Sequence, residues 1–321
     1  MIDILWIGSI RNKKWILGNW ILENRKRIPL RSATVWLPLT FAKNHRVNSL
    51  FPKKLPKSRV YFFSYPTTFA WYSEQKDIAS RSIVLYTHNE QPELGSDEFQ
   101  VQLLNRAFAV HFFSSADAAR LLKQGLNEEK IRVVNGAIDL DLPRGNIPWE
   151  NREQLVIMAS RFGYRKNPGL LTSVIRAIPE WNFLLLGRGW DDYLKENSLS
   201  KLSNLEYVIM NKESRNSQFP RGRVFLSTST LEGGPIPLLE SMYVDVSPVV
   251  SNTGFAQDVI LENVSSHIFE QGATVDKIAE MISFCPPLTE ANKRFLEKFS
   301  WDFIARQIFS DFLEIRAMSS E

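Results

Sequence analysis

Short apolar runs that alternate with amphipathic stretches constrain the fold of this chain more than any other feature of its sequence. The runs lie at 4–8, 34–37, 59–63, 82–86 and 110–113, and again at 155–159, 182–186, 207–210, 224–226 and 248–250. Between several of them, apolar residues recur at the spacing of a helix face. Strands that alternate with helices predict parallel sheets covered by helices, so the expected fold class is α/β.

The pattern restarts after a segment at 142–148 that contains two prolines and a glycine. A chain of 321 residues exceeds what one hydrophobic core supports, so two domains are expected. We predict two Rossmann-like, doubly wound domains that face a central cleft, at 1–147 and 148–300. A C-terminal helix at 301–321 is expected to pack back on the first domain. Folds of this kind bind ligands at the carboxyl ends of their strands.

The composition is that of an ordinary globular enzyme, with 44% hydrophobic and 23% charged residues. A single cysteine, Cys285, excludes an internal disulfide framework and is typical of proteins of the reducing cytoplasm. The first residues carry an acid and no basic segment, and no apolar run has the length of a membrane span. The expected location is therefore cytoplasmic.

Positive charge is concentrated at the N-terminal end of the chain. Residues 1–60 hold 13 Lys and Arg against 2 Asp and Glu, whereas the remaining residues sum to −7. Such asymmetry favours contact with an anionic partner, for example the inner face of a membrane through 25–27, 53–57 and neighbouring aromatic residues such as Trp20. A solvated basic face explains the charge equally well; binding to anionic vesicles that weakens with salt would separate the two. Nucleic acid is an unlikely partner, because the aromatic residues lie mostly at core spacing.

The stretch 227–242 has the sequence of a strand end, a tight turn and a helix start. Gly233 and Gly234 form the turn, and the prolines that follow are tolerated in a first helical turn. Free backbone N–H groups and the helix dipole favour an anion at such a place. Glu232 and Glu240 bracket the predicted anion site, where they could accept hydrogen bonds from sugar hydroxyls. The alternative is that both acids only favour the helix N-terminus.

A second group of charged residues follows the first strand of the C-terminal half. Arg161, Arg165 and Lys166 lie in the loop after that strand, at the same edge of the predicted sheet. Arg binds phosphate through a planar fork and Lys binds it as a point charge, so the loop could neutralise a pyrophosphate. The alternative is a solvated basic loop.

Segments 155–171, 183–189 and 226–260 resemble the C-terminal domain of the retaining family 4 glycosyltransferases, which have the glycosyltransferase-B fold. That family carries a Glu-x7-Glu motif, matched by Glu232 and Glu240, and an Arg-x4-Lys pair, matched by Arg161 and Lys166. The resemblance reaches back to 131–139, which is similar to the family's interdomain hinge. The chain departs from the family after Met242, where the usual glycine is missing and Asp245 is expected to adopt the left-handed turn.

The resemblance implies a role for each matched residue. Glu240 would bind the nucleotide ribose, Glu232 would lie beside the donor sugar, and Arg161 and Lys166 would contact the diphosphate. The base would rest against the strand end near Met210. The backbone of the glycine-rich turn would complete the donor site, through Gly233, Gly234, Pro235 and Ile236.

The N-terminal half contributes weaker candidates. His88, at the end of a predicted strand, resembles a histidine that such transferases place opposite the donor sugar; the alternative is a histidine bonded to local backbone. The catalytic group would then comprise Glu232, His88, Arg161 and Lys166. The loop after the first strand is expected on the acceptor side, through Gly8, Ser9, Lys13 and Trp15.

The expected activity is that of a retaining glycosyltransferase that moves a sugar from a nucleoside diphosphate sugar to a glycan, lipid or small-molecule acceptor. No cofactor and no metal are expected: Asp139-Leu140-Asp141 spells a metal-binding motif, but it falls in the predicted hinge. The alternatives on the same fold are a sugar phosphorylase, a nucleotide-sugar epimerase or a non-catalytic nucleotide-sugar-binding subunit.

Overall fold

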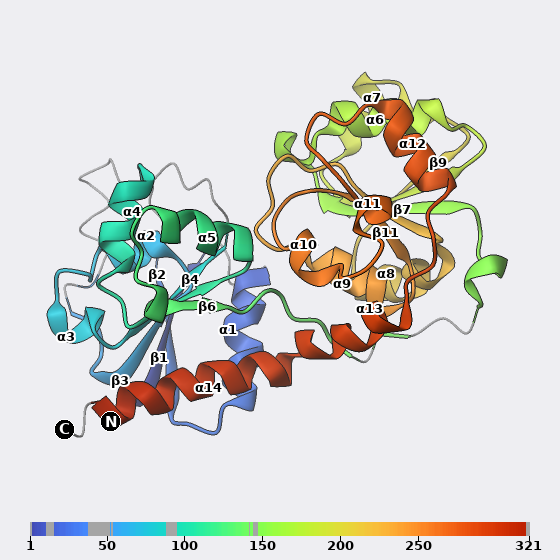
Figure 1. Cartoon of the computed structure of the whole chain (residues 1–321). Coiled ribbons are helices and arrows are strands. Elements are labelled where there is room, and N and C mark those ends of the chain that lie inside the picture. Colours follow the sequence, from blue (N-terminus) through green and yellow to red (C-terminus); the bar gives the residue numbers. More distant parts are fainter. Residues whose placement is uncertain are drawn as a thin grey trace. The chain divides into compact units, whose positions relative to one another are not determined.

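The computed structural model describes residues 2–10, 16–37, 52, 54–87, 95–140, 142–143 and 147–318. The chain divides into two compact units, each with its own parallel sheet (Figure 1). Unit 1 comprises Met1–Asn135 and Trp301–Glu321, and unit 2 comprises Gly136–Ser300. This division falls before the proline-containing segment that was predicted as the boundary, and it assigns the C-terminal helix to unit 1.

Unit 1 has a six-stranded parallel sheet in the order β2-β1-β3-β4-β5-β6. Its strands are β1 (Ile2–Ser9), β2 (Ser32–Leu37), β3 (Ser58–Phe63), β4 (Ser82–Tyr86), β5 (Ala109–Phe112) and β6 (Ile131–Val133). Its helices are α1 (Ile16–Arg27), α2 (Pro66–Ala70), α3 (Lys76–Ala79), α4 (Asp97–Leu104), α5 (Ser115–Lys123) and α14 (Trp301–Met318). The strand order changes direction between β1 and β3, which is the usual place for a ligand in such a sheet.

Unit 2 has a six-stranded parallel sheet in the order β12-β11-β10-β7-β8-β9. Its strands are β7 (Leu155–Arg161), β8 (Asn182–Arg188), β9 (Leu205–Ile209), β10 (Val224–Ser227), β11 (Ser247–Ser251) and β12 (Ile268–Phe269). Its helices are α6 (Pro168–Ala177), α7 (Asp191–Glu196), α8 (Lys212–Gln218), α9 (Ile236–Tyr243), α10 (Ala256–Val259), α11 (Val264–His267), α12 (Val275–Ser283) and α13 (Glu290–Phe295). The strand order of this sheet reverses between β7 and β10. The loops after these two strands therefore lie at the topological switch point.

The continuous apolar runs of the sequence follow from burial of the sheet on both faces. In β7 and β8, alternate side chains enter two separate cores. Ile157 and Leu184 belong to one core, and Met158 and Leu185 to the other. The prediction of an α/β fold with two doubly wound sheets is therefore confirmed.

Helix α14 belongs to unit 1 although it follows unit 2 in the sequence. In Figure 1 it runs beside α1, and Trp301 packs edge-on against Trp20 with ring centroids 5.6 Å apart. Asp311 of α14 is buried against the sheet. It contacts Nε2 of the fully buried His111 and accepts a hydrogen bond from Nε of Arg132 at 3.1 Å. His111 and Arg132 outweigh the effect of burial and hold the pKa of Asp311 below its usual range.

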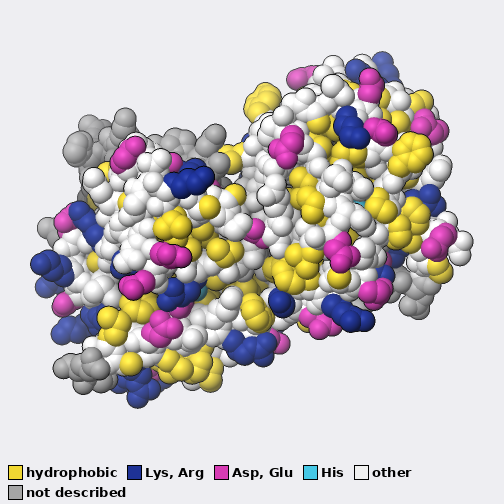
Figure 2. Space-filling view, viewed as in Figure 1, with side chains coloured by type: hydrophobic (Ala, Val, Ile, Leu, Met, Phe, Trp, Pro, Cys, Tyr) yellow, Lys and Arg dark blue, Asp and Glu magenta, His cyan; other side chains and the backbone are white. Residues whose placement is uncertain are grey.

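The described part of the basic N-terminal segment does not form the arrangement of bases beside exposed aromatic residues that was expected. Trp20 is 0% exposed, so it belongs to the core and is unavailable to a membrane surface. The two acids of the segment each hold two bases: Glu23 pairs with Lys26 and Arg27, and Asp3 pairs with Arg31 and Arg59. On the face shown in Figure 2, acidic and basic side chains are interspersed over unit 1. Contact with an anionic membrane stays a prediction.

The contacts of Asp311 predict its contribution to stability. Asp311→Ala should lower the free energy of unfolding by about 3 kcal/mol, because it leaves the buried His111 and the half-buried Arg132 without their partner. Glu314→Ala is the matched control, since it removes an exposed carboxylate 3.4 Å from the same arginine and should cost less than about 0.5 kcal/mol. Urea unfolding followed by tryptophan fluorescence measures both. Equal midpoints for the two variants would contradict the assignment.

Candidate functional site

Two loops meet at the switch point of unit 2. The first follows β7 and contains a single helical turn, Tyr164–Lys166, before α6 begins at Pro168. The second follows β10 and leads through the glycine pair to α9. Because β7 and β10 are neighbouring parallel strands, their carboxyl ends bring both loops to one edge of the sheet.

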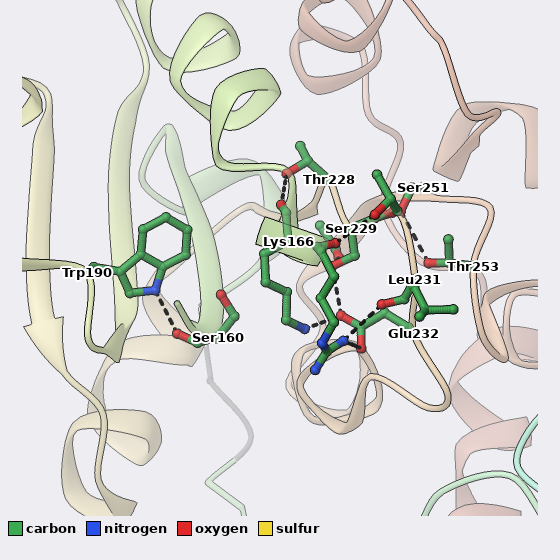
Figure 3. A network of polar contacts seen from close by, with 12 residues as sticks. Ser160, Lys166, Trp190, Thr228, Ser229, Leu231, Glu232, Ser251 and Thr253 are labelled. Carbon is green, nitrogen blue, oxygen red and sulfur yellow. Dashed lines mark hydrogen bonds and ion pairs between the residues drawn. The ribbon is translucent and has the colours of Figure 1, made fainter. Parts of the chain in front are cut away.

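The carboxylate of Glu232 lies at the centre of this edge (Figure 3). It is 7% exposed, and it accepts hydrogen bonds from three side chains. Lys166 Nζ and Ser229 Oγ, the latter at 2.7 Å, donate to Oε1. Arg165 Nη1 donates to Oε2 at 2.8 Å. The Glu232 carboxylate is therefore charge-compensated and held in one orientation.

Backbone hydrogen bonds join the same two loops. Thr230 N donates to the carbonyl of Arg165 at 2.8 Å, and Thr228 Oγ1 donates to the carbonyl of Lys166 at 2.8 Å. Gly254, in the loop after β11, has φ +56°, and a Cβ there would lie 2.8 Å from the carbonyl oxygen of Gly233. Only glycine allows this approach, so a third strand end packs closely behind the glycine-rich turn.

The paired charges of Glu232, Lys166 and Arg165 affect the pKa values of Glu232 and Lys166. Burial alone would raise the pKa of Glu232, but Lys166 and Arg165 outweigh it and hold that pKa below its usual range. Burial lowers the pKa of Lys166, and the attraction of Glu232 opposes this shift. The close pairing favours the charged form of both groups at neutral pH.

A second carboxylate, Glu240 of α9, is 6% exposed and pairs with Arg215 of α8. Arg215 Nη1 donates to Oε1 at 2.6 Å. Burial raises the pKa of Glu240, and Arg215 works against that shift. Sequence reasoning selected Glu240 but missed Arg215, because no spacing relates an arginine of one short helix to an acid 25 positions later in another.

The predicted donor-site residues all lie in unit 2, at the carboxyl edge of its sheet. Arg161 is the exposed last residue of β7, in register with Arg188 of β8, whereas Lys166 and Arg165 reach Glu232. Arg165 was a candidate phosphate ligand, and its contact with Glu232 was not foreseen. The remaining predicted positions are half-buried or buried around the start of α9 and the end of β9: Gly233, Gly234, Pro235, Ile236 and Met210.

The N-terminal candidates are placed differently. Gly8 and Ser9 were expected in a loop, but they are buried residues of β1. Gly8 leaves room for Trp36, whose ring lies 2.6 Å from where a Cβ would be. Lys13, Trp15 and His88 lie outside the described residues. The acceptor-side and His88 roles stay predictions.

The sequence predicts neither a metal site nor a membrane-spanning helix. Within the described ranges, no three His, Cys, Asp or Glu side chains cluster in a way that could hold a metal ion, and Asp141 lies outside those ranges. No helix in the same part of the chain combines the length and the apolar character needed to cross a bilayer.

A cavity of about 280 Å³ in unit 2 is lined by Trp149, Asp245 and Lys293, among others. Asp245 has φ +62°, which confirms the predicted left-handed turn.

Comparison with known proteins agrees with this geometry. Residues 143–295 match the family model described as "Glycosyl transferases group 1". A human relative, one of the subunits of phosphatidylinositol N-acetylglucosaminyltransferase, is 25% identical over 171 residues, which are 50% of this chain. The match spans only 34% of that relative's length.

Solved structures of the same architecture cover all or nearly all of the chain. Anabaena Alr3699/HepE in complex with UDP has a TM-score of 0.74 at 16% identity, covering 100% of both chains. Sucrose-phosphate synthase from Thermosynechococcus elongatus has a TM-score of 0.72 at 14% identity, covering 98% of this chain and 100% of the other. The fold is the glycosyltransferase-B fold, as the resemblance implied.

The pKa of Glu232 predicts a pH dependence of stability. A carboxyl whose pKa is lowered on folding stabilises the protein above its ordinary pKa of 4.5, and this contribution is lost as pH falls through the lowered value. Glu232→Gln should therefore cost about 2 kcal/mol at neutral pH and progressively less in acid. Glu153→Gln, which alters an exposed pair with Arg221, is the control and should change little. A loss for Glu232→Gln that is the same at acid and neutral pH in urea unfolding would refute this explanation.

Proposed function

We propose that this chain, whose C-terminal unit carries a group 1 glycosyl transferase domain, is a retaining glycosyltransferase that uses a nucleoside diphosphate sugar. The observation that carries the proposal is the pairing of Glu232 with Lys166 and Arg165 at the switch point of the unit 2 sheet. A half-buried lysine and an exposed arginine beside a glycine-rich turn offer the positive charge that a diphosphate requires.

The leaving group determines what these residues do. As the bond between the anomeric carbon and the diphosphate oxygen breaks, negative charge grows on the diphosphate. Lys166, Arg161 and the backbone at the start of α9 stabilise that charge, which is the main electrostatic contribution to the rate. Glu232 compensates the charges of Lys166 and Arg165. The diphosphate shares these cations with Glu232 when it binds.

Retention follows from a transfer on one face of the sugar. The bond from the anomeric carbon to the acceptor oxygen forms on the face that the diphosphate leaves, and the acceptor's proton passes to a diphosphate oxygen. Glu232 is unsuited to attack the sugar as a nucleophile, because donors from Lys166, Arg165 and Ser229 occupy both of its oxygens. Its role is to order the cations beside the donor sugar, and Glu240 binds the ribose.

The proposal extends to the partners of the reaction. The co-substrate is a nucleoside diphosphate sugar, in keeping with the UDP that one structural neighbour holds. No cofactor takes part. The acceptor is a hydroxyl of a glycan, a lipid or a small molecule, and the enzyme works in the cytoplasm, where its basic N-terminal segment can meet an anionic inner membrane face. A screen of nucleotide sugars that records released nucleotide identifies the donor.

The electrostatic role of the cations predicts their effect on turnover. Lys166→Ala and Arg161→Ala should each lower kcat by about a hundredfold, because charge-assisted contacts to a leaving group strengthen in the transition state. Lys195→Ala is the matched control: it removes an exposed lysine of α7 in the same unit and should leave kcat unchanged. The measurement is product formation from the donor found in the screen. A variant lacking both Arg161 and Lys166 that keeps near-native turnover would contradict the diphosphate assignment.

Metal independence is tested by removing metal. Turnover should persist in EDTA, because the cations that face the leaving group are side chains of the protein rather than a divalent ion. Assays with and without chelator, followed by addition of Mg²⁺ or Mn²⁺, provide the comparison. Activity that disappears in EDTA and returns with either ion would show that a metal supports the reaction.

A further inference from the structure

Arg215 is held firmly at the same sheet edge as the rest of the site. It lies in α8, which directly follows β9 and lies beside α9 in Figure 1. Asn211 and Ser214 cap the start of α8 reciprocally, with Asn211 Oδ1 accepting from Ser214 N at 2.8 Å and Ser214 Oγ accepting from Asn211 N at 2.9 Å. Phe219, which is fully buried, anchors the end of the helix. The capped and anchored helix therefore holds the backbone of Arg215 in place.

The guanidinium of Arg215 divides its donors between two acceptors. Nη1 donates to Glu240 Oε1 at 2.6 Å, while Nε and Nη2 donate to Asn216 Oδ1 at 3.2 and 3.1 Å. The side chains of Arg215 and Glu240 are 14% and 8% exposed. This arrangement fixes the plane of the Glu240 carboxylate. Among the described residues no donor occupies Oε2, so that oxygen remains to accept hydrogen bonds from a ligand.

Arg215 also affects the ionisation of Glu240. An ionised carboxylate only accepts hydrogen bonds, whereas a protonated carboxyl donates from one of its oxygens. Burial raises the pKa of Glu240 and so favours the protonated form. Two charged groups act on this carboxyl. Arg215 from α8 favours its ionised form, and the negative charge of Asp139 opposes ionisation. Without Arg215, the pKa of Glu240 would rise further.

We propose that Arg215 is a positioning residue for nucleotide recognition, which orients Glu240 through Oε1 and leaves Oε2 for the ribose hydroxyls of the donor. The inference rests on the proposed function, because it takes Glu240 as the ribose ligand. It adds a division of labour within the site. Lys166 and Arg161 recognise the diphosphate, and the Asn216–Arg215–Glu240 chain recognises the ribose. Arg215 thus affects affinity for nucleosides rather than for phosphate.

The test compares a ligand that has a ribose with one that lacks it. Calorimetry measures binding of UDP and of inorganic pyrophosphate to the full chain, with ADP and GDP as alternatives to UDP. Arg215→Met should weaken nucleoside diphosphate binding about tenfold and leave pyrophosphate binding unchanged. Lys166→Ala should weaken both. Arg221→Met is the matched control, since it removes an arginine from an exposed pair with Glu153, and it should change neither.

A pH series separates positioning from a merely structural role. With Arg215→Met, nucleoside diphosphate affinity should begin to fall at a higher pH than in the wild type, because Glu240 loses the cation that lowers its pKa and is protonated more readily. Arg215→Lys keeps the positive charge and should restore the wild-type pH profile. Its affinity should still fall about threefold, because an ammonium lacks the planar guanidinium that orients the carboxylate. Melting temperatures establish that each variant is folded.

The outcomes are distinguishable. If the wild type binds no nucleoside diphosphate, the proposed function itself fails. If the wild type binds and Arg215→Met binds equally well with the same pH profile, only the role of Arg215 is overturned. Equal losses for the nucleoside diphosphate and pyrophosphate would make Arg215 a phosphate contact and overturn it as well. Should Arg215→Met not fold, Asn216→Ala and Arg215→Lys replace it, and unchanged affinity in both would refute the proposal.

Discussion

The buried carboxylate of Glu232 is the interaction on which the rest of the candidate site depends. Removing a carboxylate from water is costly, and the cost is offset only where several donors converge on it. Here a lysine, an arginine and a serine from two loops converge on it. The requirement to satisfy one acid therefore fixes the course of both loops, and with them the position of the cations and of the turn that opens α9.

Two carboxylates eight residues apart in the sequence reach different electrostatic states. Glu232 has two cations and its pKa falls, whereas Glu240 has one cation and its pKa rises. Glu232 has both oxygens engaged, and Glu240 has a described donor on one alone. The Glu-x7-Glu motif thus contains one carboxylate with both oxygens hydrogen-bonded and one carboxylate with an oxygen that can still accept a hydrogen bond. The difference suits ordering of neighbouring cations in the first case and ligand recognition in the second.

Most of the fold could be predicted from the sequence, because buried parallel strands leave continuous apolar runs. The strands β6 and β12 have only three and two residues, too few for a recognisable pattern. The site was predictable only where local sequence carries it, as in the glycine-rich turn and the loop after β7. The pairs Lys166–Glu232 and His111–Asp311 join residues 66 and 200 positions apart, and side-chain packing decides such pairs. Trp20 was misplaced for the same reason, since its partner Trp301 lies at the far end of the chain.

The two ends of unit 2 lie side by side, because Ile138 N donates to the carbonyl of Phe299 at 2.8 Å and Ile138 forms an isolated bridge with Ser300. Unit 2 is in this sense a closed loop inserted into unit 1. The order of events on the ribosome follows from it. When residue 135 has been synthesised, the unit 1 sheet is complete but His111 and Trp20 still lack Asp311 and Trp301. All of unit 2 must be translated before α14 emerges, so the half that begins first is the half that finishes folding last.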